Sequence, residues 1–207
     1  MNKQFLVNYL KNVSDIMMKH KEELILMDSI VGDGDLGLTM SDGFAAAYNS
    51  IANDENEDLG RLLYMSGRAM ATAVPSTMGT LMASGLMQDG KEFKGKTETD
   101  LSGLYDLFKA FQDGVQHRGK AKVGEKTFVD GLNGAVISIK ESLDSNQTYV
   151  ELVNNAYDGA VKGYQGTVGM LAVHGRAATR GEASRKLKDP GAYVAVLLME
   201  SLKNTKE

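Results

Sequence analysis

Apolar residues recur at every third or fourth position along most of the chain, which is the spacing of one helical face. The pattern covers six stretches: residues 5–17, 59–73, 101–115, 128–143, 149–173 and 192–202. Apolar and polar residues nowhere alternate cleanly at a period of two, as they would in a half-buried strand. The pattern therefore predicts an all-α bundle or barrel of about eight helices joined by short loops. Because the sequence has no repeat and no proline-rich linker, we expect a single domain over residues 1–207.

Composition narrows the class of protein. The chain has 23 glycines but 2 prolines, which suits long helices joined by tight glycine loops. It has no cysteine, so disulfides, zinc–thiolate sites and a cysteine nucleophile are ruled out. A formal net charge of -4 argues against nucleic acid or an anionic membrane as a partner. No apolar run reaches roughly 18 residues and no signal core opens the chain, so we expect a cytoplasmic protein.

The clearest chemical signal lies between residues 28 and 40. Asp28, Asp33 and Asp35 lie close together with glycines between them, and a helical pattern follows from Leu38. Carboxylate oxygens suit a hard cation, Mg2+ before zinc or copper. The free N–H groups and positive dipole end of the following helix would attract phosphate. The segment thus predicts a metal and a phosphate held at one place, as phosphoryl transfer requires.

The same segment also has a purely structural interpretation. In it, Asp35 caps the helix, Asp33 forms a turn and Asp28 is solvated. Acidic glycine loops are common, so the segment by itself favours neither interpretation.

A second glycine-rich string, residues 119–127, resembles a Walker A phosphate loop with one residue too many. It follows a predicted helix, whereas a phosphate loop of that kind follows a strand, so we reject a Walker site. What remains is a flexible glycine–lysine loop leading into a helix that starts near Thr127. The loop is either an anion contact or a solvated basic turn.

Residues 174–191 form the most basic segment of the chain. Its cations are Arg176, Arg180, Arg185, Lys186 and Lys188. The planar guanidinium suits phosphate oxygens, although runs of charge are more often simply solvated. Asp189 and Pro190 predict the N-cap and first turn of the last helix. Ser76 and Thr77, between two other helices, either hold a phosphate or cap a helix, which is the more frequent use.

Taken in order, these segments resemble the L subunit, or L domain, of dihydroxyacetone kinases. The resemblance covers nearly the whole chain and rests on the 28–40 segment, Arg118-Gly119-Lys120-Ala121, Gly124-Glu125-Lys126-Thr127, Gly175-Arg176-Ala177, Gly181-Glu182 and Asp189-Pro190-Gly191. It implies a barrel of eight antiparallel helices with the nucleotide at one end. It also implies a subunit that binds ADP or ATP with Mg2+ and phosphorylates dihydroxyacetone, or a related small ketose, on a separate K subunit.

The resemblance assigns site residues by position. Asp28, Asp33 and Asp35 match the aspartates that hold a pair of Mg2+ ions against the nucleotide phosphates. Arg176 matches a phosphate-side arginine, assigned here as the catalytic residue because it would offset charge on the transferring group. The remaining nucleotide contacts, which include the helix start, the adenine wall and the closing turn, are Leu36, Gly37, Leu38, Thr39, Ser76, Thr77, Gly119, Phe128, Asp189, Pro190 and Gly191.

Two positions depart from the family pattern. Leu36 stands where the family usually has histidine, and residues 73–78 replace a glycine-rich stretch. Aligning on residues 79–81 places Val74 at the family's serine, whereas a gap places Ser76 there. These departures point to a divergent member acting on dihydroxyacetone or a related small ketose.

The sequence leaves more than one function open. A phosphotransferase-system M-type protein that recharges bound ADP from phosphoenolpyruvate is the favoured donor, since no K domain is fused to these 207 residues. Direct use of ATP is the alternative. A non-enzymatic nucleotide-binding regulator is disfavoured by the retention of all three aspartates. A second copy of the chain, forming a homodimer, stays open as a further partner.

Overall fold

The computed structural model describes all residues 1–207 and confirms the all-α prediction, with one isolated bridge between Asn2 and Glu98 and no strand. The helices are α1 (Lys3–Lys19), α2 (Lys21–Val31), α3 (Leu36–Asn49), α4 (Leu59–Ala73), α5 (Thr77–Glu92), α6 (Gly103–Gly119), α7 (Phe128–Asp144), α8 (Tyr149–Gly166), the 3-10 helix η1 (Arg176–Lys186) and α9 (Pro190–Lys203). No helix combines the length and the apolar content that a bilayer span needs.

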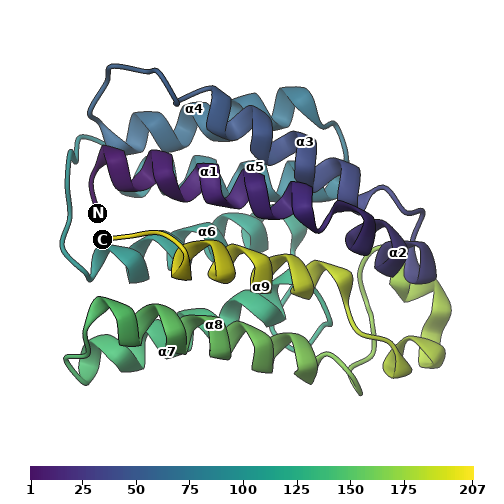
Figure 1. Cartoon of the computed structure of the whole chain (residues 1–207). Helices are drawn as coiled ribbons and strands as arrows, with labels where there is room; N and C mark the ends of the chain where they lie inside the picture. Colours follow the sequence, from purple (N-terminus) through teal and green to yellow (C-terminus); the bar gives the residue numbers. More distant parts are fainter.

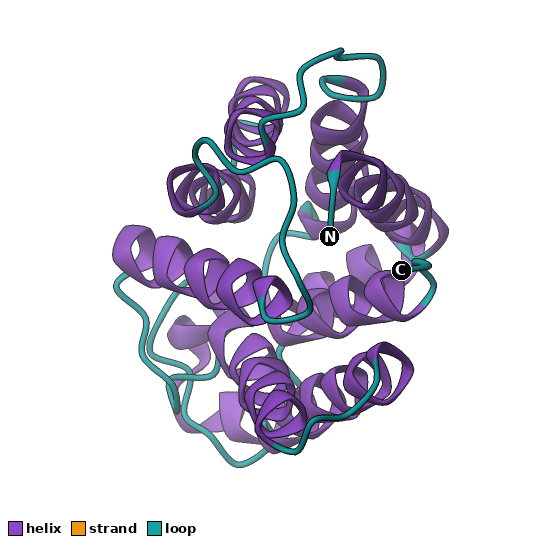
Figure 2. Cartoon of the chain, turned by 90° about the vertical axis from the view of Figure 1, so that its left-hand side faces the viewer, coloured by secondary structure: helices purple, strands orange, loops and turns teal.

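Eight of these helices close into a ring. Starting at α1, each of α3, α4, α5, α6, α7, α8 and α9 packs against the one before it, and α9 returns to α1. Successive members of the ring run in alternating directions, so both chain termini lie at one end of the barrel (Figure 1). Figure 2, turned by 90°, shows that connecting loops cross this end. The ring is the antiparallel barrel that the resemblance implied.

The apolar stripes of these helices face inward and form one core. A single cluster of 45 buried residues fills the ring and takes members from every helix of it. Glycine sets the closest approach: a Cβ added at Gly134 of α7 would collide with the carbonyl oxygen of Gly159 of α8, and the reverse also holds. The close packing of α7, α8 and α9 positions the loops that emerge at the end of the barrel opposite the chain termini.

Two elements differ from the sequence prediction. Residues 21–31 form helix α2, so Asp28 lies on the last turn of a helix and not in a loop. The helix expected over 149–173 ends at Gly166. It stops there because the Thr167 hydroxyl donates to the Tyr164 carbonyl and Gly169 takes a left-handed conformation, φ 96°. The chain then crosses the end of the barrel through η1 before entering α9.

Candidate functional site

The N-termini of four helices meet at one end of the barrel. Helices α3, α5, α7 and α9 begin at Leu36, Thr77, Phe128 and Pro190, and all four residues line a single cleft of about 870 Å3. Each helix start offers backbone N–H groups without a helical partner and the positive end of a dipole. The alternating topology of the barrel therefore builds one anion-attracting surface from four separate elements.

Side chains cap three of these helix starts, but not the fourth. Ser76 accepts from the Gly79 amide, Thr127 forms a capping box with Asp130, and Asp189 accepts from the Ala192 amide. The predicted start near Thr127 and the Asp189–Pro190 N-cap are thereby confirmed. Asp35 stands at the N-cap position of α3 yet makes no capping hydrogen bond. The structural interpretation of this carboxylate is wrong, and its oxygens are left for another partner.

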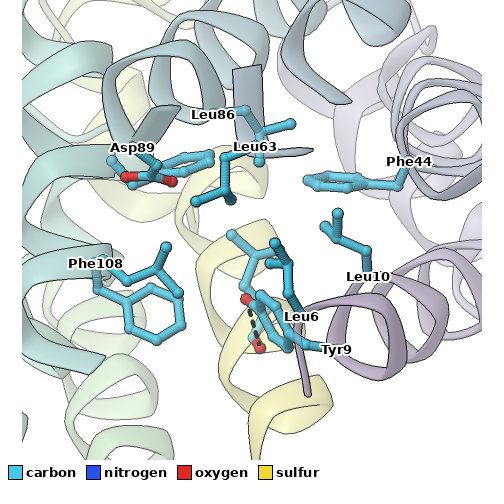
Figure 3. A pocket seen from close by; sticks show the side chains of 11 residues that line it. Leu6, Tyr9, Leu10, Phe44, Leu63, Leu86, Asp89 and Phe108 are labelled. Atoms are coloured by element: carbon cyan, nitrogen blue, oxygen red, sulfur yellow. Dashed lines mark hydrogen bonds between the residues drawn. The ribbon is translucent and has the colours of Figure 1, made fainter. Parts of the chain in front are cut away.

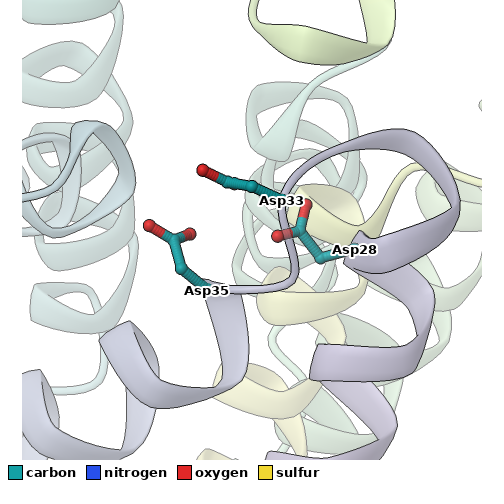
Figure 4. A group of neighbouring side chains, drawn as sticks. All are labelled: Asp28, Asp33 and Asp35. Carbon is teal, nitrogen blue, oxygen red and sulfur yellow. The ribbon is translucent and has the colours of Figure 1, made fainter.

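The three predicted metal ligands converge at the start of α3. One oxygen from each of Asp28, Asp33 and Asp35 lies within 4.8 Å of the others. Figure 4 shows the three carboxylates facing a common space from the end of α2, the connecting loop and the start of α3. Asp28 also accepts hydrogen bonds from the Gly34 amide at 2.9 Å and the Leu36 amide at 3.4 Å, which fold the loop back onto α2.

Glycine makes this tight return possible. Gly34 has φ 78°, a conformation that side-chain-bearing residues rarely adopt, and an added Cβ would lie 2.6 Å from the Ser29 hydroxyl. A Cβ at Gly37 would collide with the Lys21 carbonyl, so α2 and α3 approach closely only because this residue is glycine. Gly34 between the aspartates and Gly37 just after them therefore allow the carboxylates to come together.

The convergence has an electrostatic cost that a cation would remove. Partial burial raises the pKa of Asp35, and the charges of Asp33 and Asp28 raise it further, while the Arg176 guanidinium opposes the shift. Arg176 reaches across from η1 and pairs with Asp33 at 2.5 Å. An all-oxygen set of three acidic groups is the donor chemistry that Mg2+ prefers, so these residues fit the ion that the sequence predicts.

Most of the predicted metal-binding and nucleotide-binding residues line the same cleft. These are Asp28, Asp33, Asp35, Leu36, Ser76, Thr77, Gly119, Phe128, Arg176, Asp189, Pro190 and Gly191. Gly37, Leu38 and Thr39 are not among the lining residues. Thr39 lies behind the surface, where its hydroxyl donates to the Ser76 hydroxyl at 3.1 Å. Within the loop that departs from the family pattern, Ser76 faces the cleft and Val74 is buried in the core.

Part of the cleft lining is apolar. Phe128 packs its ring against Phe111, 5.9 Å between centroids, and Gly119 ends helix α6 beside it. Asp189, which also lines the cleft, is buried, and burial raises its pKa to about 7 despite the nearby Lys126 ammonium. A cleft lined both by apolar residues such as Phe128 and by aspartates, an arginine and helix starts suits a nucleotide.

Sequence reasoning missed two features of the 119–127 loop. Lys126 is buried, with 2% of its surface exposed, so the loop is not merely a solvated basic turn. His174 pairs with Glu125 at 2.6 Å and joins this loop to the segment that carries Arg176. Neither contact leaves a local pattern, since each depends on residues more than forty positions away.

Comparison with known proteins agrees with this geometry. The family described as the DAK2 domain matches residues 30–204. The chain is 31% identical over 203 residues to the ADP-binding subunit DhaL of PEP-dependent dihydroxyacetone kinase 2 from Listeria innocua, covering 96% of this chain and 93% of that protein. It is 30% identical over 197 residues to the ADP-binding subunit DhaL of the PEP-dependent dihydroxyacetone kinase from Escherichia coli K12, covering 95% and 94%.

A solved structure shares the fold. The dihydroxyacetone kinase from C. freundii, in complex with AMP-PNP and Mg2+, superposes with a TM-score of 0.70 at 18% identity over 96% of this chain. This chain covers 33% of that longer kinase. The two curated bacterial relatives, by contrast, match it nearly end to end.

Proposed function

The chain belongs to the DAK2 domain family, and from this premise we propose that it is the ADP-binding, magnesium-dependent subunit of a dihydroxyacetone-type kinase. Its acceptor is dihydroxyacetone or a related small ketose held on a separate K subunit. The observation that carries the proposal is the meeting of three carboxylates with four helix N-termini in one cleft. That combination serves a bound metal and a polyphosphate together.

The proposed division of labour follows from the positions of the residues. Asp28, Asp33 and Asp35 would hold a pair of Mg2+ ions, whose charge would neutralise the phosphate oxygens. The free amides at the starts of α3 and α5 hold the phosphates, and Phe128 forms the wall for the base. Arg176 stands on the aspartate side, where it offsets charge on the transferring group. Phosphoryl transfer needs positioning and charge stabilisation, so this subunit supplies no nucleophile.

We further propose that the nucleotide stays bound and is recharged. The two relatives that match nearly end to end are named as ADP-binding subunits of PEP-dependent kinases, so an M-type protein of the phosphotransferase system is the proposed donor. Direct use of ATP is the competing scheme. The two differ in nucleotide exchange: ADP that is retained through purification and exchanges slowly supports recharging, and rapid exchange with ATP contradicts it.

Titration calorimetry tests the site directly. ADP is titrated into the purified chain with Mg2+ and with EDTA, after a check for nucleotide that copurifies. We expect binding that requires Mg2+, or ADP already in place. No binding in either condition would contradict the proposal and leave a helical interaction module as the better interpretation.

A product assay tests the reaction. The chain is combined with its cognate K subunit, dihydroxyacetone and either ATP or the phosphoenolpyruvate-driven donor system. We expect a phosphorylated ketose with at least one donor. Intact ADP binding without product from dihydroxyacetone or its close analogues would reject the kinase activity while keeping the nucleotide site.

A further inference from the structure

Residues 168–186, here called the covering loop, cross the end of the barrel between α8 and α9 and carry Arg176 to the aspartates (Figure 1). The loop is narrow where it leaves the barrel. The Gly169 amide donates to the Arg185 carbonyl at 2.8 Å, and this hydrogen bond joins the outgoing and the returning segment of the loop. Farther in, the Ala172 amide donates to the Ser184 hydroxyl at 3.1 Å. These two contacts make the covering loop one unit. Its position therefore depends on what holds its two ends, which together form its base.

One ammonium from another part of the chain bonds to both sides of that base, beside a hydrogen bond from the Asp189 amide to the Thr167 hydroxyl at 3.1 Å. Lys126 Nζ donates to the carbonyl of Thr167 at 2.5 Å and also to the carbonyl of Leu187. Thr167 directly precedes the covering loop and Leu187 directly follows it. Both ends of the loop are thus hydrogen-bonded to one side chain that does not belong to it.

The surroundings of Lys126 partly offset the cost of burying its charge. An ammonium is buried only where hydrogen bonds and opposite charges satisfy it. Burial lowers the pKa of Lys126, and the nearby carboxylates of Asp189 and Asp130 oppose that shift. Asp130 is itself fixed by hydrogen bonds from the Gly124 amide at 2.5 Å and the Thr127 amide at 2.7 Å.

Lys126 has φ 60°, in the left-handed region that residues other than glycine adopt only occasionally, and the exposed Lys120 shares this conformation. Lys122, four positions earlier in the same loop, is exposed. The difference between Lys122 and Lys126 is position and burial, not residue type.

We propose that Lys126 is a positioning residue: by holding both ends of the covering loop, it fixes Arg176 over the aspartate cluster. The inference rests on the proposed function for the role of Arg176, but the anchoring itself does not. Removing the ammonium should loosen the covering loop as a unit while the aspartates, held by α2 and α3, keep their places.

Limited proteolysis tests the anchor without nucleotide. The covering loop offers trypsin four cleavage sites, Arg176, Arg180, Arg185 and Lys186. We expect Lys126→Met to speed cleavage there by about tenfold, since it removes two charge-assisted hydrogen bonds. Lys122→Met is the matched control and should cleave like the wild type. Equal rates in all three proteins would overturn the proposal.

Lys126→Gln keeps the test decisive if the methionine variant fails to fold. Its amide retains a donor for one carbonyl without the charge, so it should cleave at an intermediate rate. Circular dichroism and thermal melting establish that each variant is folded before cleavage is compared. A folded glutamine variant with wild-type cleavage would reject the anchor.

A double-mutant cycle tests the link to Arg176. If Lys126 acts through Arg176, Lys126→Met in an otherwise wild-type chain should lower the rate of phosphoryl transfer about tenfold. The same change in an Arg176→Ala background should lower it little. The affinity for ADP should change less than the transfer rate. Additive losses would mean that Lys126 acts on the nucleotide by itself and would overturn the positioning role. A wild type that binds no ADP would instead reject the proposed function, while the cleavage result would still decide the anchor.

Discussion

The three aspartates of the cleft differ in how much of the fold depends on them. Asp28 accepts two backbone amides that fold the loop, so its replacement would disturb structure as well as charge. Asp33 makes a single ion pair with Arg176, and both side chains are substantially exposed. Asp33 is therefore the residue at which a metal-binding role separates most cleanly from a structural one.

Asp33→Asn is predicted to weaken Mg2+-dependent ADP binding at least about tenfold, because one charged ligand is lost. The free energy of unfolding should change by less than about 1 kcal/mol, since an exposed ion pair contributes little. Calorimetry and urea unfolding measure the two quantities. Asp144→Asn is the control, because it also removes an exposed ion pair but lies at the C-terminal end of α7, away from the cleft. Unchanged ADP affinity in Asp33→Asn would defeat the metal assignment.

Arg176→Ala is predicted to slow phosphoryl transfer by about 100-fold while changing ADP affinity only a few-fold. The reason is that the guanidinium would act on charge that develops during transfer. Arg180→Ala, in the same exposed loop, is the control. Steady-state assays with the K subunit, together with calorimetry, separate the two effects. Equal losses in rate and affinity would make Arg176 an ordinary binding residue.

The charged residues of the site were partly visible in the sequence. Asp28, Asp33 and Asp35 could be grouped because glycines at short spacing allow a tight return of the chain. The burial of Lys126 could not, because its partners Thr167 and Leu187 come from distant loops. Local patterns indicate which side chains have useful chemistry, and tertiary packing decides which of them are held in place.

At the scale of the helices, α7 and α8 illustrate how glycine sets the spacing of the barrel. The helices pack backbone against backbone at Gly134 and Gly159, where neither has room for a Cβ. Gly166, the last residue of α8, has open space around it and no left-handed φ. The same substitution at Gly159 and Gly166 should therefore have opposite effects.

Gly159→Ala is predicted to lower the free energy of unfolding by about 1–3 kcal/mol, because the helices must separate to admit a methyl group. Gly166→Ala should leave it unchanged or raise it by up to about 1 kcal/mol, since alanine favours the helical backbone. Urea unfolding of the two variants beside the wild type measures both. Similar effects at the two positions would show that close helix packing is not what the Gly159 site requires.

The helices themselves were largely predictable, and the exceptions have physical causes. Stripes such as 5–17 and 128–143 match α1 and α7 closely because one face of each helix is buried along its length. Helix α2 was missed because it buries only Leu24 and Val31 and shows no stripe. Apolar residues recur at the helical period only where one face of a helix is buried. A helix that lies outside the ring and buries little therefore shows no such pattern.

At the scale of the whole molecule, one carboxyl group breaks the apolar core. Asp89 on α5 is 1% exposed and lies among leucine and phenylalanine side chains beside a cavity of about 20 Å3 (Figure 3). Its Oδ1 has no hydrogen-bond partner. The nearby Tyr9 hydroxyl donates to the Leu198 carbonyl, at 3.5 Å, and does not satisfy it. Burial therefore raises the pKa of Asp89 well above its usual range.

This shift fixes the sign of a pH dependence. Between the ordinary aspartate pKa and the raised one, the folded protein keeps a proton on Asp89 that the unfolded chain releases. The contribution of Asp89 to the free energy of unfolding is therefore fully present below about pH 4. Above that pH it falls by up to about 1.4 kcal/mol per pH unit. Asp189 contributes a loss of the same sign, complete near its pKa of about 7.

Asp89→Asn separates the effect of the core carboxyl on stability from that of every other titrating group. Asparagine cannot ionise, and the variant and the wild type share all remaining acids. The difference in unfolding free energy between the variant and the wild type should grow in favour of the variant as the pH rises from about 5 to 8. Urea titrations across that range measure it, with Asp158→Asn on the exposed face of α8 as the control. A difference that stays constant with pH would mean that Asp89 is ionised in the folded barrel. The core would then have to stabilise a buried charge, which its leucine and phenylalanine lining gives it no means to do.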